Sequence, residues 1–238
     1  MSDPISTIVS RGAAKLNIEL PPKAGAAFRV YYDFLEKCGM NVNLTAISGA
    51  QEVARLHFLD SIALLKAANF TNKSVIDIGS GAGFPGIPLK IAEPSIKLTL
   101  LEATGIRATF LSGLSAKLGI DSVCKNTRAE EAAHCADMRE QYDIVVSRAV
   151  ARLNVLCELC LPFLKPGGIF LAMKSTDCSD ETKEAKNAAD VLGAEYLEHH
   201  DYTIPDTDIT HRVIRIQKLT KTPDEFPRRF AKIQKSPL

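Results

Sequence analysis

The stretch VIDIGSGAGFPGIPL, residues 75–89, decides the fold of this 238-residue chain. A mostly apolar run at 75–78 is followed at once by four glycines and two prolines within 79–89. The run predicts a buried strand, and the glycines and prolines predict a tight turn that leads into a helix. In an open α/β sheet, a turn in this position is where a ligand binds.

The glycine spacing alone leaves two cofactors open. Gly79, Gly81 and Gly83 form GxGxG, whereas Gly81, Gly83 and Gly86 form the GxGxxG that is typical of dinucleotide binding. Glycine suits such a loop because it adopts positive φ and lets a ligand approach closer than a Cβ would permit. A dinucleotide and S-adenosylmethionine are both compatible with this pattern.

The neighbouring residues favour S-adenosylmethionine over NAD. Pro85 and Pro88 remove N–H donors where a pyrophosphate would meet the helix N-terminus. The carboxylate of Asp77 would repel a pyrophosphate but suits a ligand that carries an ammonium and a sulfonium group. Glu102 ends the next predicted strand, where a carboxylate can accept from ribose hydroxyls. We therefore predict an S-adenosylmethionine site that includes Asp77, Gly79, Gly81, Gly83 and Glu102.

Strands alternate with helices beyond this loop. The patterns predict strands at 74–79, 97–102, 122–127, 142–149, 168–174, 194–204 and 211–218, and helices that include 105–119, 152–164 and 179–192. This alternation predicts an α/β, Rossmann-like fold: a seven-stranded, mostly parallel sheet with helices on both faces. The last two strands are joined by a short loop, which predicts an antiparallel pair at one end of the sheet.

The first 70 residues form a helical extension in this interpretation. Residues 22–39 place apolar side chains at helical spacing, and Ser48–Gln51 fits a capping box that opens a second helix over 49–69. We expect an extension over 1–70 packed on a Rossmann-like domain over 71–238, which ends in a basic segment, 219–238.

Composition excludes several classes of protein. Hydrophobic residues make up 46% and charged residues 24% of the chain, and no apolar run reaches the roughly 18 residues of a membrane span. The N-terminus lacks the pattern of a secretory signal, so we expect a cytoplasmic protein, and a monomer. The single CxxC, Cys157 and Cys160, lies in an apolar stretch without a second ligand pair. We predict buried thiols and no metal.

Positive charge gathers near the C-terminus. Residues 211–238 contain eight Lys or Arg and two acidic residues. Basic residues interleaved with Phe226 and Phe230 suit phosphate contacts and base stacking, although on composition alone a solubilising tail is an equal alternative. The candidate RNA contacts are Arg228, Arg229, Lys232 and Lys235.

Seven motifs along the chain carry a resemblance: NVNLTAI (41–47), HFLDSI (57–62), GSGAGFPGIPL (79–89), LLEATGIRATFL (100–111), TRAEE (127–131), SRAVA (147–151) and FPRRFAKIQKSPL (226–238). Together they resemble the small-subunit ribosomal RNA methyltransferase G family, also called glucose-inhibited division protein B. The resemblance implies a methyltransferase that uses S-adenosylmethionine to modify N7 of one guanosine in 16S rRNA, with the rRNA or the small ribosomal subunit as partner.

The resemblance also implies particular site residues. Cofactor contacts fall on Gly79, Phe84, Ala129, Glu130 and Arg148. The chain departs from the family pattern at Ile106, where a lysine is usual, and in the tail at Ala231 and Ile233. At Ser175 it lacks the usual glycine, which leaves the role of Lys174 open.

The chemistry of guanine N7 explains why no general base is evident in the sequence. N7 already has an in-plane lone pair, so methylation needs alignment and electrostatics rather than proton removal. We predict Arg148 as the catalytic residue, contacting guanine O6 or the methionine carboxylate. His57 and Asp60 either support the sheet as a polar pair or take part in catalysis. Because N7 faces the deep, narrow groove of an RNA helix, we expect a target in a loop or turned out of its stack.

Three other functions stay open at this point. The chain could methylate another RNA or a small molecule, or it could bind RNA and cofactor without turnover. An NAD-linked oxidoreductase is disfavoured because no Tyr-x-x-x-Lys pair is present. The sequence leaves open which guanosine is modified, and whether naked rRNA or an assembled subunit is the substrate.

Overall fold

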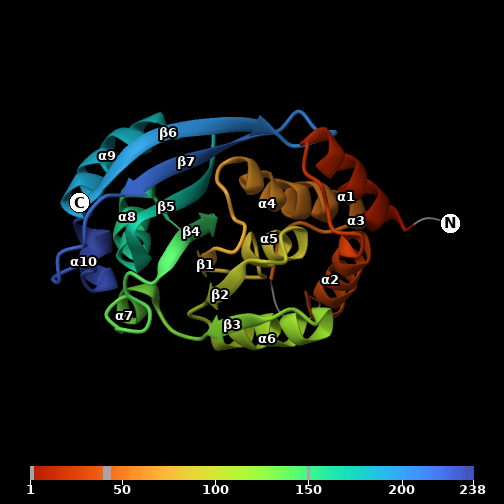
Figure 1. Cartoon of the computed structure of the whole chain (residues 1–238), viewed down its shortest axis with the longest axis horizontal. Helices are drawn as coiled ribbons and strands as arrows, with labels where there is room; N and C mark the ends of the chain where they lie inside the picture. Colours follow the sequence, from red (N-terminus) through yellow and green to blue (C-terminus); the bar gives the residue numbers. More distant parts are fainter. Residues whose placement is uncertain (1–2, 40–43, 149–150) are drawn as a thin grey trace.

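A computed structural model describes residues 3–39, 44–148 and 151–238 (Figure 1). The motifs at 41–47 and 147–151 therefore lie partly outside the described residues. The centre of the molecule is one seven-stranded sheet with the order β3-β2-β1-β4-β5-β7-β6. Its strands are β1 Ser74–Ile78, β2 Lys97–Leu101, β3 Ser122–Lys125, β4 Tyr142–Arg148, β5 Leu164–Ser175, β6 Ala194–Thr203 and β7 Thr210–Lys218.

The sheet is mostly parallel, as predicted. β1 pairs in parallel with β2 and β4, and β3 and β5 extend the parallel part outward, whereas β7 runs antiparallel to both β5 and β6. The chain moves outward from β1 through β2 to β3 and then returns to β4 on the other side of β1. The order of the strands thus reverses between β1 and β4, which is where an α/β sheet opens a crevice for a ligand.

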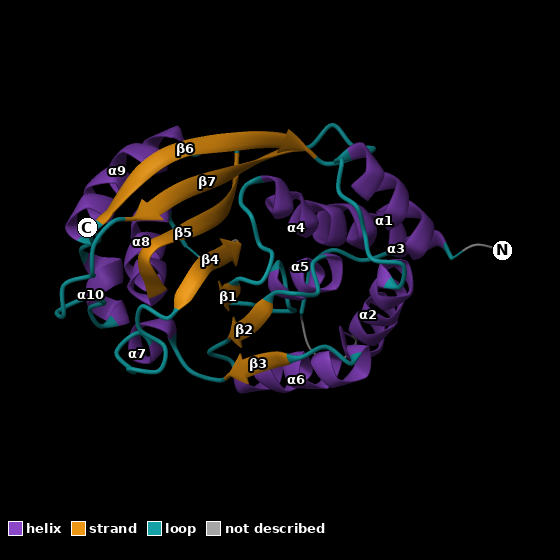
Figure 2. Cartoon of the chain, in the orientation of Figure 1, coloured by secondary structure: helices purple, strands orange, loops and turns teal. Residues whose placement is uncertain are grey.

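Helices cover both faces of the sheet (Figure 2). The α-helices are α1 Pro4–Lys15, α2 Ala24–Gly39, α3 Ala50–Val53, α4 Asp60–Ile62, α5 Gly86–Ala92, α6 Gly105–Leu118, α7 Ala129–Ala132, α8 Leu153–Cys160, α9 Ser179–Val191 and α10 Phe230–Lys235. A π-helical segment, η1 Ala54–Leu59, and two 3₁₀ segments, η2 Ala63–Lys66 and η3 Leu161–Phe163, complete the set. Within the described residues no helix is both long and apolar enough to cross a membrane.

Alternate residues of each central strand enter different cores. In β1, Val75 packs among α1, α2, α5 and α6, whereas Ile76 packs on the opposite face with α8 and α9. In β4, Val146 and Val145 are divided in the same way. Both faces are buried, which is why the parallel strands read as nearly continuous apolar runs in the sequence.

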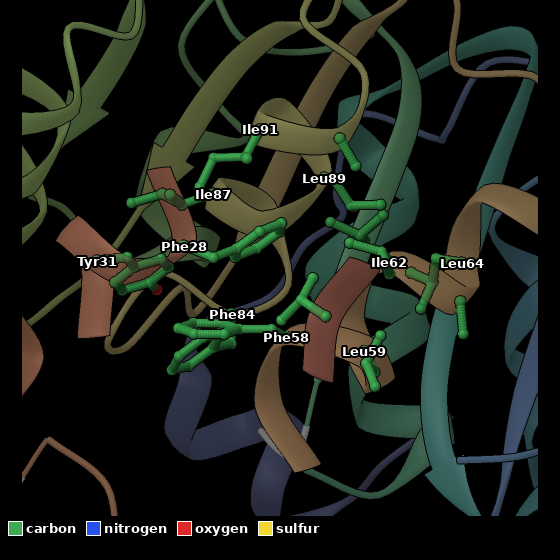
Figure 3. Close-up of a cluster of buried hydrophobic side chains, with 14 of the residues drawn as sticks. Phe28, Tyr31, Phe58, Leu59, Ile62, Leu64, Phe84, Ile87, Leu89 and Ile91 are labelled. Carbon is green, nitrogen blue, oxygen red and sulfur yellow. The ribbon is translucent and has the colours of Figure 1, made fainter. Parts of the chain in front are cut away.

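The N-terminal helices share one core with the sheet. Aromatic rings from α2, η1 and the glycine loop meet there: Phe28 lies 4.9 Å from Phe58, and Tyr31 stacks on Phe84 at 5.2 Å between ring centroids (Figure 3). The Tyr31 hydroxyl donates to the Ala82 carbonyl at 2.6 Å. These contacts hold the glycine loop against α2. The division of the chain at residue 70 stays a prediction.

Three local predictions are wrong in detail. Gly49, with φ of 87°, is the N-cap of α3 and no side chain caps that helix end, so Ser48 and Gln51 form no capping box. The predicted single helix over 49–69 instead passes through η1 and ends in a 3₁₀ turn. The fifth strand was predicted at 168–174, but β5 begins at Leu164; Tyr142 pairs with Leu164 and Ile144 with Ile169, so residues 165–168 bulge from the ladder.

Candidate active site

The glycine loop 79–85 lines a cavity of about 410 Å³ at the point where the strand order reverses. Its size is within the range of small-ligand pockets. Predicted site residues Gly79, Gly81, Phe84, Glu102 and Arg148 line this cavity, together with Leu44, Thr45, His57, Ser80, Ala82, Ala103 and Arg107. We call it the loop cavity.

The glycines of the loop serve different purposes. Gly79, Gly81 and Gly83 all have positive φ, at 73°, 57° and 100°. A Cβ on Gly81 would meet only the Gly79 carbonyl oxygen, 3.9 Å away, and Gly81 lines the cavity, so a ligand has room to approach the backbone here. A Cβ on Gly83 would lie 2.7 Å from the Tyr31 hydroxyl and 2.8 Å from Ile87. The Cβ side of Gly83 therefore faces the core, which gives this glycine a packing role, and its cofactor contact stays a prediction.

Glu102 holds the loop and borders the cavity at once. Its Oε2 accepts from the Gly81 N–H at 2.9 Å and its Oε1 from the Thr104 N–H at 2.8 Å. Each oxygen keeps a lone pair for a further donor, as ribose hydroxyls would supply. The prediction that Glu102 binds the cofactor is compatible with this geometry.

Asp77 lies beneath the loop rather than at the mouth of its strand. Its side chain is fully buried, and Oδ2 accepts from the Gly86 N–H at 2.9 Å, at the start of α5. Burial raises the pKa of Asp77 to about 7. Asp77 thus joins the end of β1 to the start of α5 and does not line the loop cavity, and its contact with a ligand stays a prediction.

Arg148, at the end of β4, is held by a buried carboxylate. Asp60 is 1% exposed; its Oδ2 accepts from Arg148 at 3.2 Å, and its Oδ1 accepts from the Tyr202 hydroxyl and from His211 Nδ1, both at 2.7 Å. Burial alone would raise the pKa of Asp60, but the His211 hydrogen bond and the Arg148 charge lower it below its usual value. The same contact raises the pKa of His211. Asp60 is thus an ionised hub that orients Arg148.

His57 contacts both Arg148 and the Phe84 ring. Its ring stacks on Phe84 at 4.3 Å, and the Arg148 guanidinium lies over the same Phe84 ring at 4.9 Å. Arg148 Nη2 is 3.1 Å from His57 Nδ1, and His57 Nε2 is 2.7 Å from Thr45 Oγ1. Nδ1 also lies 3.1 Å from the Leu56 carbonyl oxygen, so it faces both the Arg148 donor and a backbone acceptor. Burial and the Arg148 charge lower the pKa of His57 to about 4, so the ring is neutral at pH 7.

A second cavity, of about 540 Å³, adjoins the loop cavity. The two share the side chains of His57 and Arg148 as a common wall. The second cavity is also lined by Ile47, Leu56, Asp60, Met173, Lys174, Ser175, Glu181, Ile209 and His211. We call it the base cavity. The arrangement offers two adjacent cavities separated by the side chains of Arg148 and His57.

Some site residues could not be found from the glycine pattern. Ala129 and Glu130 begin α7 and line neither cavity, so their predicted adenine contacts stay a prediction. Arg107 and Ser80 line the loop cavity but were not predicted as site residues. Arg107 lies in the family-like motif at 100–111, which was the available signal.

The basic C-terminal segment is packed on the protein. Arg228 donates through its backbone and side chain to Glu158, which is fully buried in α8, at 2.5 to 2.8 Å. Ile233 of α10 is fully buried as well. The Arg228 guanidinium is therefore occupied, and we withdraw it from the predicted phosphate contacts. Arg229, Lys232 and Lys235 are exposed and stay predicted RNA contacts.

No group of three or more potential metal ligands occurs in the described part of the chain. Cys157 and Cys160 are fully buried, which raises the pKa of Cys157 to about 12. They are buried thiols, as predicted.

Solved structures of low sequence identity share this fold. TYW2 from M. jannaschii, in complex with AdoMet, has a TM-score of 0.50 at 14% identity over 67% of this chain and 77% of that chain. The protein PH1948 from Pyrococcus horikoshii has a TM-score of 0.54 at 11% identity over 90% of this chain and 100% of that chain. The likeness to these structures and the strand order place the chain in the class of Rossmann-like α/β proteins, with a glycine-lined cavity at the point where the strand order reverses.

Sequence comparison defines the family within that class. The profile described as rRNA small subunit methyltransferase G matches residues 25–210. "Ribosomal RNA small subunit methyltransferase G" of Alkaliphilus oremlandii is 42% identical over 98% of this chain and 99% of that protein, and its namesake in Lachnoclostridium phytofermentans is 41% identical over 96% and 95%. The chain belongs to the rRNA small subunit methyltransferase G family. The predicted fold class, family and cofactor are thereby confirmed.

Proposed function

We propose that this protein transfers a methyl group from S-adenosylmethionine to N7 of one guanosine in the 16S rRNA of the small ribosomal subunit. Near-complete coverage by relatives named for small-subunit rRNA supports the substrate class. The observation that carries the chemistry is the pair of adjoining cavities with Arg148 and His57 between them. A cofactor in the loop cavity and a base in the second cavity would meet at this wall.

The loop cavity fits S-adenosylmethionine. The bare backbone at Gly81 permits close approach, Glu102 offers carboxylate oxygens, and Arg148 offers a cation for the methionine carboxylate or for guanine O6. When bound, the cofactor supplies a methyl group on a cationic sulfur; guanine N7 takes it with its lone pair while the S–C electrons return to sulfur, which leaves a neutral thioether and a positive charge on the 7-methylguanine.

The chain's own residues supply orientation rather than proton transfer. His57 is neutral at pH 7 because its pKa is about 4, so it adds no positive charge near the reacting atoms. Asp60 balances the charge of Arg148 beside a product that carries a new cation. The roles of both residues follow from electrostatics, since N7 has no proton to lose.

We also propose where the protein acts and which side chains contact the RNA. We place it in the cytoplasm as a monomer, with Arg229, Lys232 and Lys235 on rRNA phosphates. A different RNA as substrate is the alternative, and it shares the same cavities. Sedimentation of the purified chain tests the monomer.

The test is methylation of small subunits from cells that lack this protein. Mass spectrometry of the 16S rRNA should detect one new N7-methylguanosine with the wild-type chain. Arg148→Lys, which keeps the charge beside Asp60, should reduce the rate while S-adenosylmethionine still binds in calorimetry. Methylation confined to another RNA, or to a different guanine atom, would overturn the proposal; an unchanged Arg148→Lys rate would remove that residue from the mechanism.

A further inference from the structure

The base cavity has one wall that the loop cavity does not share. Lys174 at the end of β5 and Glu181 in the first half of α9 line only the base cavity. Arg148 and His57 form the wall toward the loop cavity. A ligand in the base cavity can therefore meet Arg148 in the shared wall and also Glu181, which lines the base cavity alone.

One oxygen of Glu181 is fixed and the other is available. Oε2 accepts from Lys174 Nζ at 2.7 Å and from the Leu153 N–H at 2.9 Å. Lys174 is held in turn by the Ala151 carbonyl at 2.6 Å. Among the described residues Oε1 of Glu181 has no hydrogen-bond partner, and the side chain is 25% exposed. The carboxylate is thus positioned by the protein with one acceptor atom to spare.

The Glu181 carboxylate is ionised at neutral pH. Burial alone would raise its pKa, but the hydrogen bonds from Lys174 and Leu153 and the nearby positive charges lower it below the usual value. An ionised carboxylate only accepts hydrogen bonds. Its natural partner is an edge of a ligand that carries donors alone.

Guanine has such an edge opposite N7. N7 and O6 lie on one side of the base, and the N1–H and the N2 amino donors lie on the other. If N7 faces the shared wall, the donor edge faces away from it, toward side chains that line the base cavity alone. Adenine presents an acceptor at N1 instead, which a carboxylate would repel. Leu56, Met173 and Ile209 supply apolar contact for the faces of a ring.

We propose that the base cavity receives the target guanine turned out of its stack, and that Glu181 selects it by accepting from N1–H and the N2 amino group. Lys174 is a positioning residue that holds the carboxylate in this orientation. The inference rests on the proposed function, because it takes N7 as the atom that faces the cofactor.

The test compares Glu181→Gln with Glu184→Gln, one turn further along the same helix. Glu184 is 44% exposed, pairs with Arg152 and does not line either cavity, so it controls for charge loss on α9. Free guanosine, inosine and adenosine serve as probes for the protein in complex with S-adenosylhomocysteine, by nuclear magnetic resonance titration. Inosine lacks the N2 amino group and keeps N7, O6 and N1–H.

Wild type and Glu184→Gln should bind guanosine roughly 10- to 100-fold more tightly than adenosine, as expected for hydrogen bonds to a charged acceptor, with inosine between them. Glu181→Gln should lose most of this preference while its affinity for S-adenosylhomocysteine is unchanged. The ratio between bases is the informative readout, because a merely structural role for Glu181 would weaken all three nucleosides alike.

Two outcomes would overturn the inference. One is equal discrimination by Glu181→Gln and Glu184→Gln; the other is wild-type protein that binds the three nucleosides alike. Methylation of small subunits by the same wild-type preparation is measured in parallel. If N7-methylguanosine forms and the base preference does not follow Glu181, the proposed function stands and the role of Glu181 is rejected. If no subunit is methylated, the proposed function itself fails.

Discussion

Asp60 accepts from three donors in a site where water is almost excluded. It is bonded to Arg148, Tyr202 and His211, and the last two come from strands more than 140 residues away in the chain. A buried carboxylate of this kind is stable only while its partners compensate its charge. The converse holds for Arg148, whose guanidinium is 17% exposed and depends on Asp60 for its orientation.

We expect Asp60→Asn to lower the free energy of unfolding by about 3 kcal/mol, because it removes one charge from a buried pair and leaves the other uncompensated. Urea denaturation at pH 7 measures this. Asp33→Asn is the matched control: Asp33 forms an exposed pair with Arg29, and such pairs contribute about 0–1 kcal/mol. Equal destabilisation by the two variants would show that the buried contacts of Asp60 contribute no more to stability than an exposed ion pair does.

The lowered pKa of His57 predicts how the stability of the folded protein depends on pH. This pKa is about 4 in the folded chain and about 6.5 when unfolded, so between these values the unfolded state binds the extra proton. Stability from this group is therefore present above pH 6.5 and is lost as the pH falls toward 4. From pH 7 to pH 5 we expect a loss of about 2 kcal/mol from His57 alone.

The variant His57→Gln isolates this contribution, since Gln keeps a donor for Thr45 and does not titrate. Urea denaturation of both proteins at pH 7 and pH 5 should show the larger drop in the wild type. His211 changes stability in the opposite direction, because its pKa is raised, but it is present in both proteins and cancels in the comparison. Parallel pH curves for the two would contradict the assignment.

Sequence reasoning found Arg148 through a resemblance but could not find its support. The motif at 57–62 drew attention to His57 and Asp60 without distinguishing a structural from a catalytic role. Their partner His211 follows β6 and a loop in the sequence, and only the antiparallel placement of β7 beside β5 brings it to Asp60. No local periodicity contains that information.

At the scale of elements, the glycine loop shows which of its residues face ligand and which face protein. Gly81 is bare toward the cavity, and Gly83 touches α2 and α5. Both have positive φ, so the sequence pattern GxGxG cannot tell them apart. The distinction comes from the aromatic core below the loop, through Tyr31 in particular.

Two alanine substitutions test this distinction. Gly83→Ala should lower the free energy of unfolding by about 3 kcal/mol, because a left-handed backbone and a close contact with Tyr31 both oppose the new Cβ. Gly81→Ala has only the backbone penalty of about 1–2 kcal/mol, but its methyl group enters the loop cavity. Calorimetry should therefore show about tenfold weaker S-adenosylmethionine binding for Gly81→Ala at a temperature where both variants are folded.

A larger stability loss for Gly81→Ala than for Gly83→Ala would contradict this assignment. So would undiminished cofactor affinity in Gly81→Ala.

The strands were predictable because both faces of the sheet are buried, which makes each parallel strand an apolar run between turn signals. The first helical region was less predictable than the strands. Residues 53–64 are buried almost all round, so the sequence has no polar face to set a helical register, and the π-helical segment η1 escaped prediction. The position of Asp77 in the sequence fits either a ligand contact or a buried link to α5, and the structure shows the link.

At the scale of the whole molecule, the C-terminal segment is both a structural element and a candidate RNA surface. Figure 1 shows α10 against α8, on the side of the sheet away from α1 and α2. Arg139 binds the segment further, donating to the carbonyls of Thr222 and Phe226 at 2.8 Å. Deleting 226–238 would expose this inner side and leave Glu158 buried without its partner. A truncation therefore cannot separate RNA binding from folding, whereas changes to exposed charges can.

The triple variant Arg229→Gln, Lys232→Gln, Lys235→Gln leaves the inner contacts of the segment in place. If these three side chains neutralise phosphates, the slope of log affinity for 16S rRNA against log salt should become shallower by about 2 to 3, at 0.7–0.9 per phosphate. S-adenosylmethionine affinity should not change, since none of the three lines the loop cavity. The matched control is Lys23→Gln, Lys37→Gln, Lys117→Gln, three exposed lysines on or beside α2 and α6. Binding is measured by filter retention from 50 to 300 mM salt. An unchanged slope in the tail variant, or an equal change of slope in the control variant, would contradict the prediction. The basic segment would then serve solubility, and the rRNA would be bound elsewhere on the protein.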